Sequence, residues 1–569
     1  MDTEEEMEGD SEEEMEGDSS FFDHNPMDSL VPQDTHDHQV KNSAGVDVHK
    51  VTDINRVLRF LCVGKENGSY YAKQKELDRE TVQSIDRLIM KGRGTDVVDL
   101  IYKVSTEGRA CKQTPTLYAL AICARSNDPK TKHAAYKILG SVCRIPTHLF
   151  EFVKFCEKES AGTGWGRSQR VAIGKWYNEK DPITLAYLVT KYKKRRGWSH
   201  RDVVRLAHVK SKNKKIKMVL KYVVTNMESA NIEYTFDQSE EDVKAFLEGV
   251  EAAKKCTKEE DIDELCRLIV EHELVREHVP TELLASEKIW DQLFRKMPMM
   301  AMLRSLGKMS SLGLLTSTCN SPSLEEFLIE QKLSNMDILK SARIHPFSLL
   351  VALMQYKAGQ GNKGKLSWDV NTTVTEALEK AFYKAFQFVT PTKKRYLLAV
   401  DDSTFMRKSS VIGSSNITAF EASLAMVLLT ARTEAKCEVI TFSREYTKLD
   451  IKKDDTLDSV LKKCDGLKRM ERSDTDCSMP MKYAMDHNKN FDVFIVYTDP
   501  DTSRSIIPPA EALREYREYT EIYDARLIVV GMVSNGFTVA DPDDPFMMDI
   551  VGFDTDSPKA MMNFVNGMI

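Results

Sequence analysis

The hydrophobic pattern of this chain changes near residue 393, and the change divides it into two unlike parts. From about residue 46 to 385, apolar residues recur at helical spacing, as in Val82, Ile85 and Ile89, and strand-like runs are scarce. A helical region of this length is too long to pack around the core of a single helix bundle. The pattern therefore predicts helix pairs stacked as an α-solenoid.

After residue 393, short apolar runs alternate with amphipathic helical ones. The runs RYLLAVDDS, CEVITF, FDVFIVYTD and RLIVVGMVS are typical of buried strands, and AFEASLAMVLLTAR and EALREYREYTEIYD of helices. This alternation predicts an α/β domain of Rossmann-like type with a largely parallel sheet. Asp401, Ser403 and Asp499 come at strand ends, where ligands bind in such sheets.

A strongly basic run lies in the helical part. From Lys191 to Lys221 there are thirteen Lys or Arg residues and a single acid, Asp202, in a chain of net charge -7. Such a local excess of cations favours a polyphosphate ligand, and we interpret it as an RNA-binding surface. The alternative is a solvated lysine-rich face. The lack of interleaved Glu weakens that alternative, because ordinary exposed helices carry both signs of charge.

The basic run also has a helical register. We expect a first helix to continue through 190–196 and to stop at Gly197, so that Lys191 and Arg195 are neighbours one turn apart. Ser199 and Asp202 resemble a capping box that starts a second helix. One face of that helix would then carry Arg201, Arg205 and His208. A lone histidine is more often structural than functional.

The first twenty residues form an acidic tail. They hold eleven acids and no base, and the sequence EEEMEGDS at 4–11 is repeated at 12–19. The rest of the chain carries 76 acids against 80 bases, so the protein is acidic only because of this tail. We expect residues 1–45 to be disordered, since so polar a segment cannot bury enough apolar surface to fold. The tail could also compete with RNA for the basic surface.

Cysteine usage and hydropathy bear on the compartment. The eleven cysteines are scattered and form no C-x-x-C pair, a pattern typical of reduced intracellular thiols. The chain has neither an apolar run of membrane-spanning length nor a secretory start. The expected location is the cytoplasm, with the nucleus as a second compartment.

The strand ends of the C-terminal part resemble the metal-ion-dependent adhesion site of von Willebrand factor A domains. In that family a D-x-S-x-S motif, a distant Thr and a distant Asp surround Mg²⁺ or Mn²⁺. Asp401, Ser403, Thr475 and Asp499 match those positions, but Phe405 stands where the last Ser belongs. The resemblance thus implies a degraded site, with one hydroxyl ligand lost and a bulky ring beside the cation. The alternative is an A domain kept only as a structural platform.

The whole chain after the tail resembles the TROVE-module family of Ro ribonucleoproteins. The similar segments are VTDINRVLRFLC, RIPTHLF, the KYKKRRGWSHRD run, ARIHPF, TDCSMPM, EALREYRE and SNGFTVADPDD. The resemblance implies a HEAT-like helical ring (46–385) whose ends are bridged by an A domain (386–569). It also implies that small structured Y RNAs bind the basic outer surface and that single-stranded 3′ ends of misfolded noncoding RNAs enter a central hole. The implied protein is a monomer that acts in RNA quality control.

The positions that the family uses for Y RNA correspond here to Lys191, Arg195 and His208. Arg167 and Arg170 lie in a similar basic motif upstream, which belongs either to the same surface or to the central hole. Two other classes of function are the alternatives: an A-type protein-interaction module with an incidental basic face, and a nuclease or other hydrolase. The chain contains no Gly-x-Ser-x-Gly, His-Glu-x-x-His or P-loop motif, so no enzymatic activity is expected.

Overall fold

A computed structural model describes most of the chain from residue 39 onward. The described residues are 39–41, 47–49, 52–66, 68–73, 76–225, 241–315, 324–361, 365–411, 415–443, 445–466, 475–499, 507–533, 540–541 and 544–569. The acidic tail lies outside them, so its predicted disorder stays a prediction. None of the helices within these ranges is both long and apolar enough to cross a membrane. None of the cysteines that the structure describes forms a disulfide.

Helices occupy the chain up to residue 384, as the hydrophobic pattern predicts. They are α1 (Asp53–Val63), α2 (Gln83–Met90), α3 (Gly94–Thr106), α4 (Gln113–Arg125), α5 (Pro129–Lys137), α6 (Leu139–Val142), α7 (Pro146–Lys158), α8 (Arg167–Asn178), α9 (Pro182–Lys191), α10 (His200–Ala207), α11 (Lys214–Thr225), α12 (Glu241–Lys255), α13 (Ile262–Glu271), α14 (Glu287–Arg295), α15 (Met299–Ser311), α16 (Leu324–Ser334), α17 (Met336–Ser341), α18 (Pro346–Lys357) and α19 (Thr372–Lys384). A short 3-10 helix, η6 (Ala385–Phe388), follows them.

Local sequence explains where several of these helices begin. Proline is the first residue of α5, α7, α9 and α18, where its missing N–H costs no intrahelical bond. Asp128 caps α5 by accepting a hydrogen bond from the Thr131 amide at 2.9 Å. In α12 the apolar residues at helical spacing are buried; they are Val243, Phe246, Leu247 and Val250.

The C-terminal part is built around one twisted sheet. Its strands are β6 (Arg395–Asp401), β7 (Lys436–Phe442), β8 (Tyr446–Lys448), β9 (Val493–Thr498), β10 (Arg526–Gly531) and β11 (Met547–Val551). Its helices are α20 (Thr404–Lys408), α21 (Ala419–Thr433), α22 (Leu457–Asp465), α23 (Met479–Asp486), α24 (Pro509–Thr520) and α25 (Ser557–Val565). The strand order is β3-β11-β10-β9-β6-β7-β8, and every pair is parallel except β7 with β8. The predicted parallel α/β domain is confirmed.

One strand of this sheet comes from the helical part of the chain. Strand β3 (Tyr70–Tyr71) pairs with β11, nearly 500 residues away in sequence. Beside it, Asp554 accepts a hydrogen bond from the Tyr70 hydroxyl at 2.9 Å and forms an ion pair with Lys112 at 3.2 Å. The side-chain amide of Asn563 donates to the Arg109 carbonyl at 2.8 Å. The first helices are therefore fastened to the last strand and helix of the chain.

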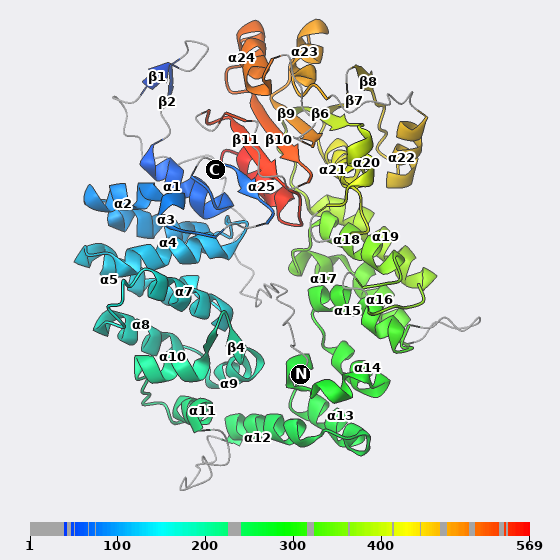
Figure 1. Ribbon diagram of the computed structural model, residues 1–569. Coiled ribbons are helices and arrows are strands. Elements are labelled where there is room, and N and C mark those ends of the chain that lie inside the picture. The colour runs from blue at the N-terminus through cyan, green and yellow to red at the C-terminus, as the bar shows by residue number, and fades with distance from the viewer. Residues whose placement is uncertain are drawn as a thin grey trace.

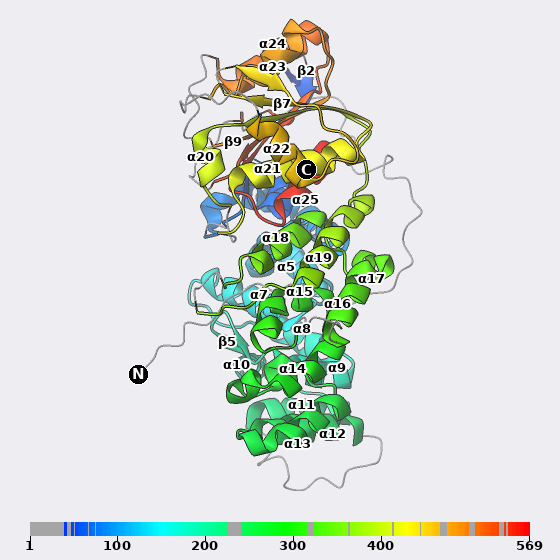
Figure 2. The same ribbon diagram turned by 90° about the vertical axis from the view of Figure 1, so that its right-hand side faces the viewer.

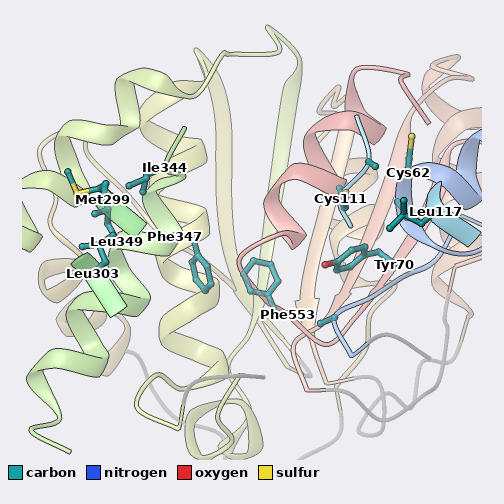
Figure 3. Close-up of a cluster of buried hydrophobic side chains, with 14 of the residues drawn as sticks. Cys62, Tyr70, Cys111, Leu117, Met299, Leu303, Ile344, Phe347, Leu349 and Phe553 are labelled. Atoms are coloured by element: carbon teal, nitrogen blue, oxygen red, sulfur yellow. The ribbon is translucent and has the colours of Figure 1, made fainter. Parts of the chain in front are cut away.

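The other end of the helical part is also attached to the sheet domain. Phe347 of α18 and Phe553, which follows β11, meet edge to face with ring centres 5.0 Å apart (Figure 3). The Tyr383 hydroxyl of α19 accepts a hydrogen bond from the Leu457 amide of α22 at 2.9 Å. Figure 1 shows the result: the helices run around a ring that the sheet domain closes, and Figure 2 shows the same stack from the side.

Candidate nucleic-acid interface

The basic run folds as a helix, a hairpin and a second helix. Helix α9 ends at Lys191, and strands β4 (Lys194–Arg195) and β5 (Trp198–Ser199) form an antiparallel hairpin. The expectation of one helix through 190–196 is therefore wrong, and Arg195 lies on the hairpin. Arg196 and Gly197 make the two-residue turn with positive φ angles of 53° and 83°, as such hairpin turns require. Gly197 is the turn residue that permits this conformation rather than a helix stop.

The second helix, α10, agrees with the prediction. The Ser199 hydroxyl accepts from the Asp202 amide at 3.3 Å, while the Asp202 carboxylate accepts from the Ser199 amide at 3.1 Å, which completes the capping box. Val203 and Val204 are buried. The opposite side is exposed to solvent and carries Arg201, Arg205 and His208. His208 ends the helix in the left-handed conformation, at φ 50°.

Lys191 lies apart from this exposed face. Only 8 % of it is exposed, and its Nζ lies 5.5 Å and 5.4 Å from the ring centres of Tyr187 and Tyr192. Burial, together with the charges of nearby lysines including Lys191, lowers the pKa of His278 to about 4. The last turn of α9 is thus a packed cationic segment, and the burial of Lys191 could not be predicted from the basic run around it.

Arg167 and Arg170 belong to the neighbouring helix. Helices α8 and α10 pack against each other, and the Trp165 and Trp198 rings that precede them lie 5.9 Å apart. The Asn178 side chain of α8 also donates to the Lys210 carbonyl just after α10, at 3.0 Å. Both arginines are exposed. In Figure 1, α8 and α10 lie toward the outside of the ring. We call the exposed set on these two helices the arginine face: Arg167, Arg170, Arg201 and Arg205.

The arginine face differs from other exposed cations in its ion pairing. Within the part of the chain that the structure describes, none of its four guanidinium groups forms an ion pair with a carboxylate. By contrast, Arg267 of α13 is held by two glutamates one turn away on either side, and Arg295 of α14 pairs with Asp291 at 3.1 Å. An arginine without an internal carboxylate keeps its planar set of donors available for phosphate oxygens.

The predicted metal ligands come together at the carboxyl ends of β6 and β9. Asp401, Ser403, Thr475 and Asp499 are each at most 2 % exposed. Asp401 accepts hydrogen bonds from the Ser403 amide at 2.8 Å and from the Thr498 hydroxyl at 2.9 Å. Burial raises the pKa of Asp401 to about 6, and nearby hydroxyls, including that of Thr475, oppose the shift. Strands β6 and β9 are neighbours although β7 follows β6 in sequence, so the cluster marks a topological switch point of the sheet.

This oxygen-rich cluster fits a hard divalent cation in part. Among the residues that the structure describes, Thr475 Oγ1 is buried without a well-formed hydrogen bond, which leaves a lone pair for a ligand. Phe405 is 40 % exposed, whereas the four oxygen-bearing residues are buried. A phenylalanine at this position supplies no oxygen ligand, so the site has one hydroxyl fewer than the family motif. Sequence reasoning missed Thr498, although it is the last residue of β9 and directly precedes Asp499.

Two family models together match nearly the whole chain. The TROVE domain matches residues 40–394, and the Ro60 vWA domain matches residues 395–565. An RNA-binding protein RO60 of Caenorhabditis elegans is 37% identical over 598 residues, covering 94% of this chain and 91% of the relative. An RNA-binding protein RO60 of Deinococcus radiodurans is 32% identical over 548 residues, covering 96% and 98%. The crystal structure of the Deinococcus radiodurans Ro (RSR) protein superposes with a TM-score of 0.82 at 30% identity, over 91% of this chain and 100% of that one.

Proposed function

Because the chain belongs to the Ro60 family of RNA-binding proteins, we propose that it binds small structured noncoding RNAs of the Y RNA type on the outside of its helical ring. The observation that carries this proposal is the arginine face, whose four guanidinium groups have no carboxylate partner among the described residues. Four such cations on two packed helices form a surface suited to a folded phosphate backbone.

The chemistry at this surface is phosphate contact and shape recognition. Each guanidinium can donate two parallel hydrogen bonds to phosphate oxygens. Arg195 extends the surface onto the β4–β5 hairpin, and His208 can donate to a backbone oxygen or stack on a base. Lys191 is 8 % exposed, so in this proposal it adds positive potential rather than a direct phosphate contact. The surface would therefore recognise the form of an RNA more than its sequence.

A second part of the proposal concerns the inside of the ring. Single-stranded 3′ ends of misfolded noncoding RNAs would enter its centre, and the protein would act in RNA quality control as a monomer, in the cytoplasm and in the nucleus. The closure of the ring by β3 and by Phe553 supports this, because only a closed ring can encircle a strand. A strand threaded in this way needs positive charge and stacking surfaces more than base readout.

The A domain would bind a divalent cation such as Mg²⁺ weakly. Asp401 and Asp499 would supply carboxylate oxygens and Ser403 and Thr475 hydroxyl oxygens, and the cation would offer an open position to an acidic group of a partner. We propose a binding role and no catalysis, in keeping with relatives whose names are those of RNA-binding proteins. Intact RNA after long incubation with the protein and Mg²⁺ is the expected result, and Mg²⁺-dependent cleavage would contradict it.

A gel-shift comparison tests the RNA-binding surface. We expect the unmodified protein to retain a hairpin RNA with a single-stranded 3′ end, and the Arg201→Ala, Arg205→Ala double variant to bind it at least tenfold more weakly. The matched control is the Arg267→Ala, Arg295→Ala double variant, which loses the same charge from exposed helices but from arginines that already have carboxylate partners. Equal binding by the two double variants would refute the assignment of the surface.

A further inference from the structure

The acidic repeat at the start of the chain has no role in the function proposed so far. It comprises residues 4–19, two identical copies of EEEMEGDS, and no Lys or Arg occurs before Lys41. Ten of its sixteen residues are glutamate or aspartate, so negative charges follow one another closely in sequence, as phosphates do along a nucleic acid strand. A segment of this kind resembles a single RNA strand in its density of negative charge.

The arginine face is the complementary surface within the same molecule. Its four arginines are exposed and have no carboxylate partner among the described residues, and Lys210 lies at the seam between α8 and α10. Every contact that favours phosphate here also favours carboxylate, since the guanidinium fork fits both. In the absence of RNA, the densest acidic segment of the chain and an unneutralised arginine surface attract each other.

The covalent connection is long enough for the two to meet. Strand β1 (Gln39–Lys41) pairs with β2 (Asp47–His49), so Gln39 lies within a few residues of the start of α1. Along the stack, α1 contacts α3, α3 contacts α5, α5 contacts α8 and α8 contacts α10. Four steps between packed helices cover about 32–40 Å. The nineteen residues between Ser19 and Gln39 can span up to about 60 Å.

We propose that the acidic repeat binds the arginine face when RNA is absent, and that RNA must displace it. This inference rests on the proposed RNA-binding surface and adds its regulation. Tethering gives the repeat a local concentration on the order of millimolar, so even a weak carboxylate–guanidinium association is populated within one molecule. An RNA that makes few phosphate contacts binds too weakly to displace the repeat, whereas a structured RNA that contacts the whole arginine face displaces it. The repeat therefore acts as a built-in filter against weakly bound RNA.

The first arm of the test measures RNA affinity. The full chain is compared with a variant whose eleven acids in residues 1–20 are replaced by Gln or Asn, using the same hairpin RNA. We expect the neutral tail to raise the affinity for RNA by about three- to tenfold. A tethered repeat at about millimolar local concentration, with a dissociation constant of roughly 0.1–0.5 mM for the arginine face, would weaken RNA binding by that factor. A synthetic peptide of residues 1–20 added in trans should reverse the gain, and a neutral peptide of the same length should not.

The second arm detects the contact without RNA. A carbodiimide couples carboxylates to lysine amines that touch them, so the full chain should yield cross-links from residues 4–19 to Lys210 and Lys194. The Arg201→Ala, Arg205→Ala variant should lose them, and the Arg267→Ala, Arg295→Ala variant should keep them. Absence of these cross-links, or equal RNA affinity with either tail, overturns the inference and leaves RNA binding intact. If neither the full chain nor the neutral-tail variant bound RNA, the proposed function would be overturned instead. The cross-linking result would still stand, because that experiment contains no RNA.

Discussion

Replacement of Phe553 by Ala should weaken the closure of the ring. Phe553 is fully buried and meets Phe347 of α18 edge to face, at 5.0 Å between ring centres (Figure 3). Truncation of a buried phenylalanine costs about 3–5 kcal/mol, of which the aromatic pair accounts for about 0.5–1.5 kcal/mol. Because Phe553 lies two residues after the end of β11, this cost falls on the contact between the sheet domain and both ends of the helical part.

Hydrogen exchange is the assay that localises such a loss. Amides of β3, β11 and α18 should lose protection by about a hundredfold or more, since each 1.4 kcal/mol is a factor of ten in the opening equilibrium. Phe405→Ala is the matched control, because Phe405 belongs to the same domain but is 40 % exposed and should cost no more than about 0.5 kcal/mol. A uniform loss of protection over the whole chain, or none at the seam, would refute the reasoning.

Three further predictions concern stability and the A domain. Burial holds the pKa of four histidines at about 3 to 4, well below the value of about 6.5 in an unfolded chain; they are His148, His200, His278 and His345. The protein should therefore be most stable above pH 6.5, and its free energy of unfolding should fall by up to about 1.4 kcal/mol per histidine for each pH unit below that. The raised pKa of Asp401 partly offsets this loss, because the folded state then binds a proton more readily than the unfolded state. A melting temperature unchanged from pH 7 to pH 5 would contradict this prediction. Arg517→Ala should destabilise the sheet domain by about 3–5 kcal/mol in urea unfolding, because it leaves the buried Asp544 without its ion-pair partner, and a loss below 1 kcal/mol would show that the pair is dispensable. Phe405→Ser should strengthen Mg²⁺ binding in calorimetry, with Asp401→Asn as the control that removes it, and no binding by either protein would mean that the cation site is lost more broadly.

Much of the fold follows from local pattern. The continuous apolar runs predict β6, β7, β9 and β10 nearly to the residue, because strands buried on both faces have no polar positions to obscure them. The capping box of Ser199 and Asp202 likewise predicts the start of α10, because both partners lie within one turn. The arginines of α10 could be placed on one face for the same reason.

Contacts between distant parts of the chain could not be predicted in this way. Strand β3 has two residues, and only its pairing with β11 makes it a strand. The lysines and arginines of 193–196 favour a helix, yet the hairpin that contains them packs against α7, and this tertiary contact overrides helix propensity. The helical register places Lys191 beside Arg195, but its charged end lies over the rings of Tyr187 and Tyr192, a cation–π arrangement that depends on tertiary packing.

The salt dependence of RNA binding tests the central proposal most directly. Affinity for one hairpin RNA would be measured by fluorescence anisotropy over a series of salt concentrations, for the unmodified protein and for the Arg201→Ala, Arg205→Ala and Arg267→Ala, Arg295→Ala double variants. Each lost phosphate contact should reduce the slope of log affinity against log salt by about 0.9, so the first variant should flatten the slope by nearly two and the second should leave it unchanged. Identical slopes for all three proteins would contradict the proposal that the arginine face holds the RNA.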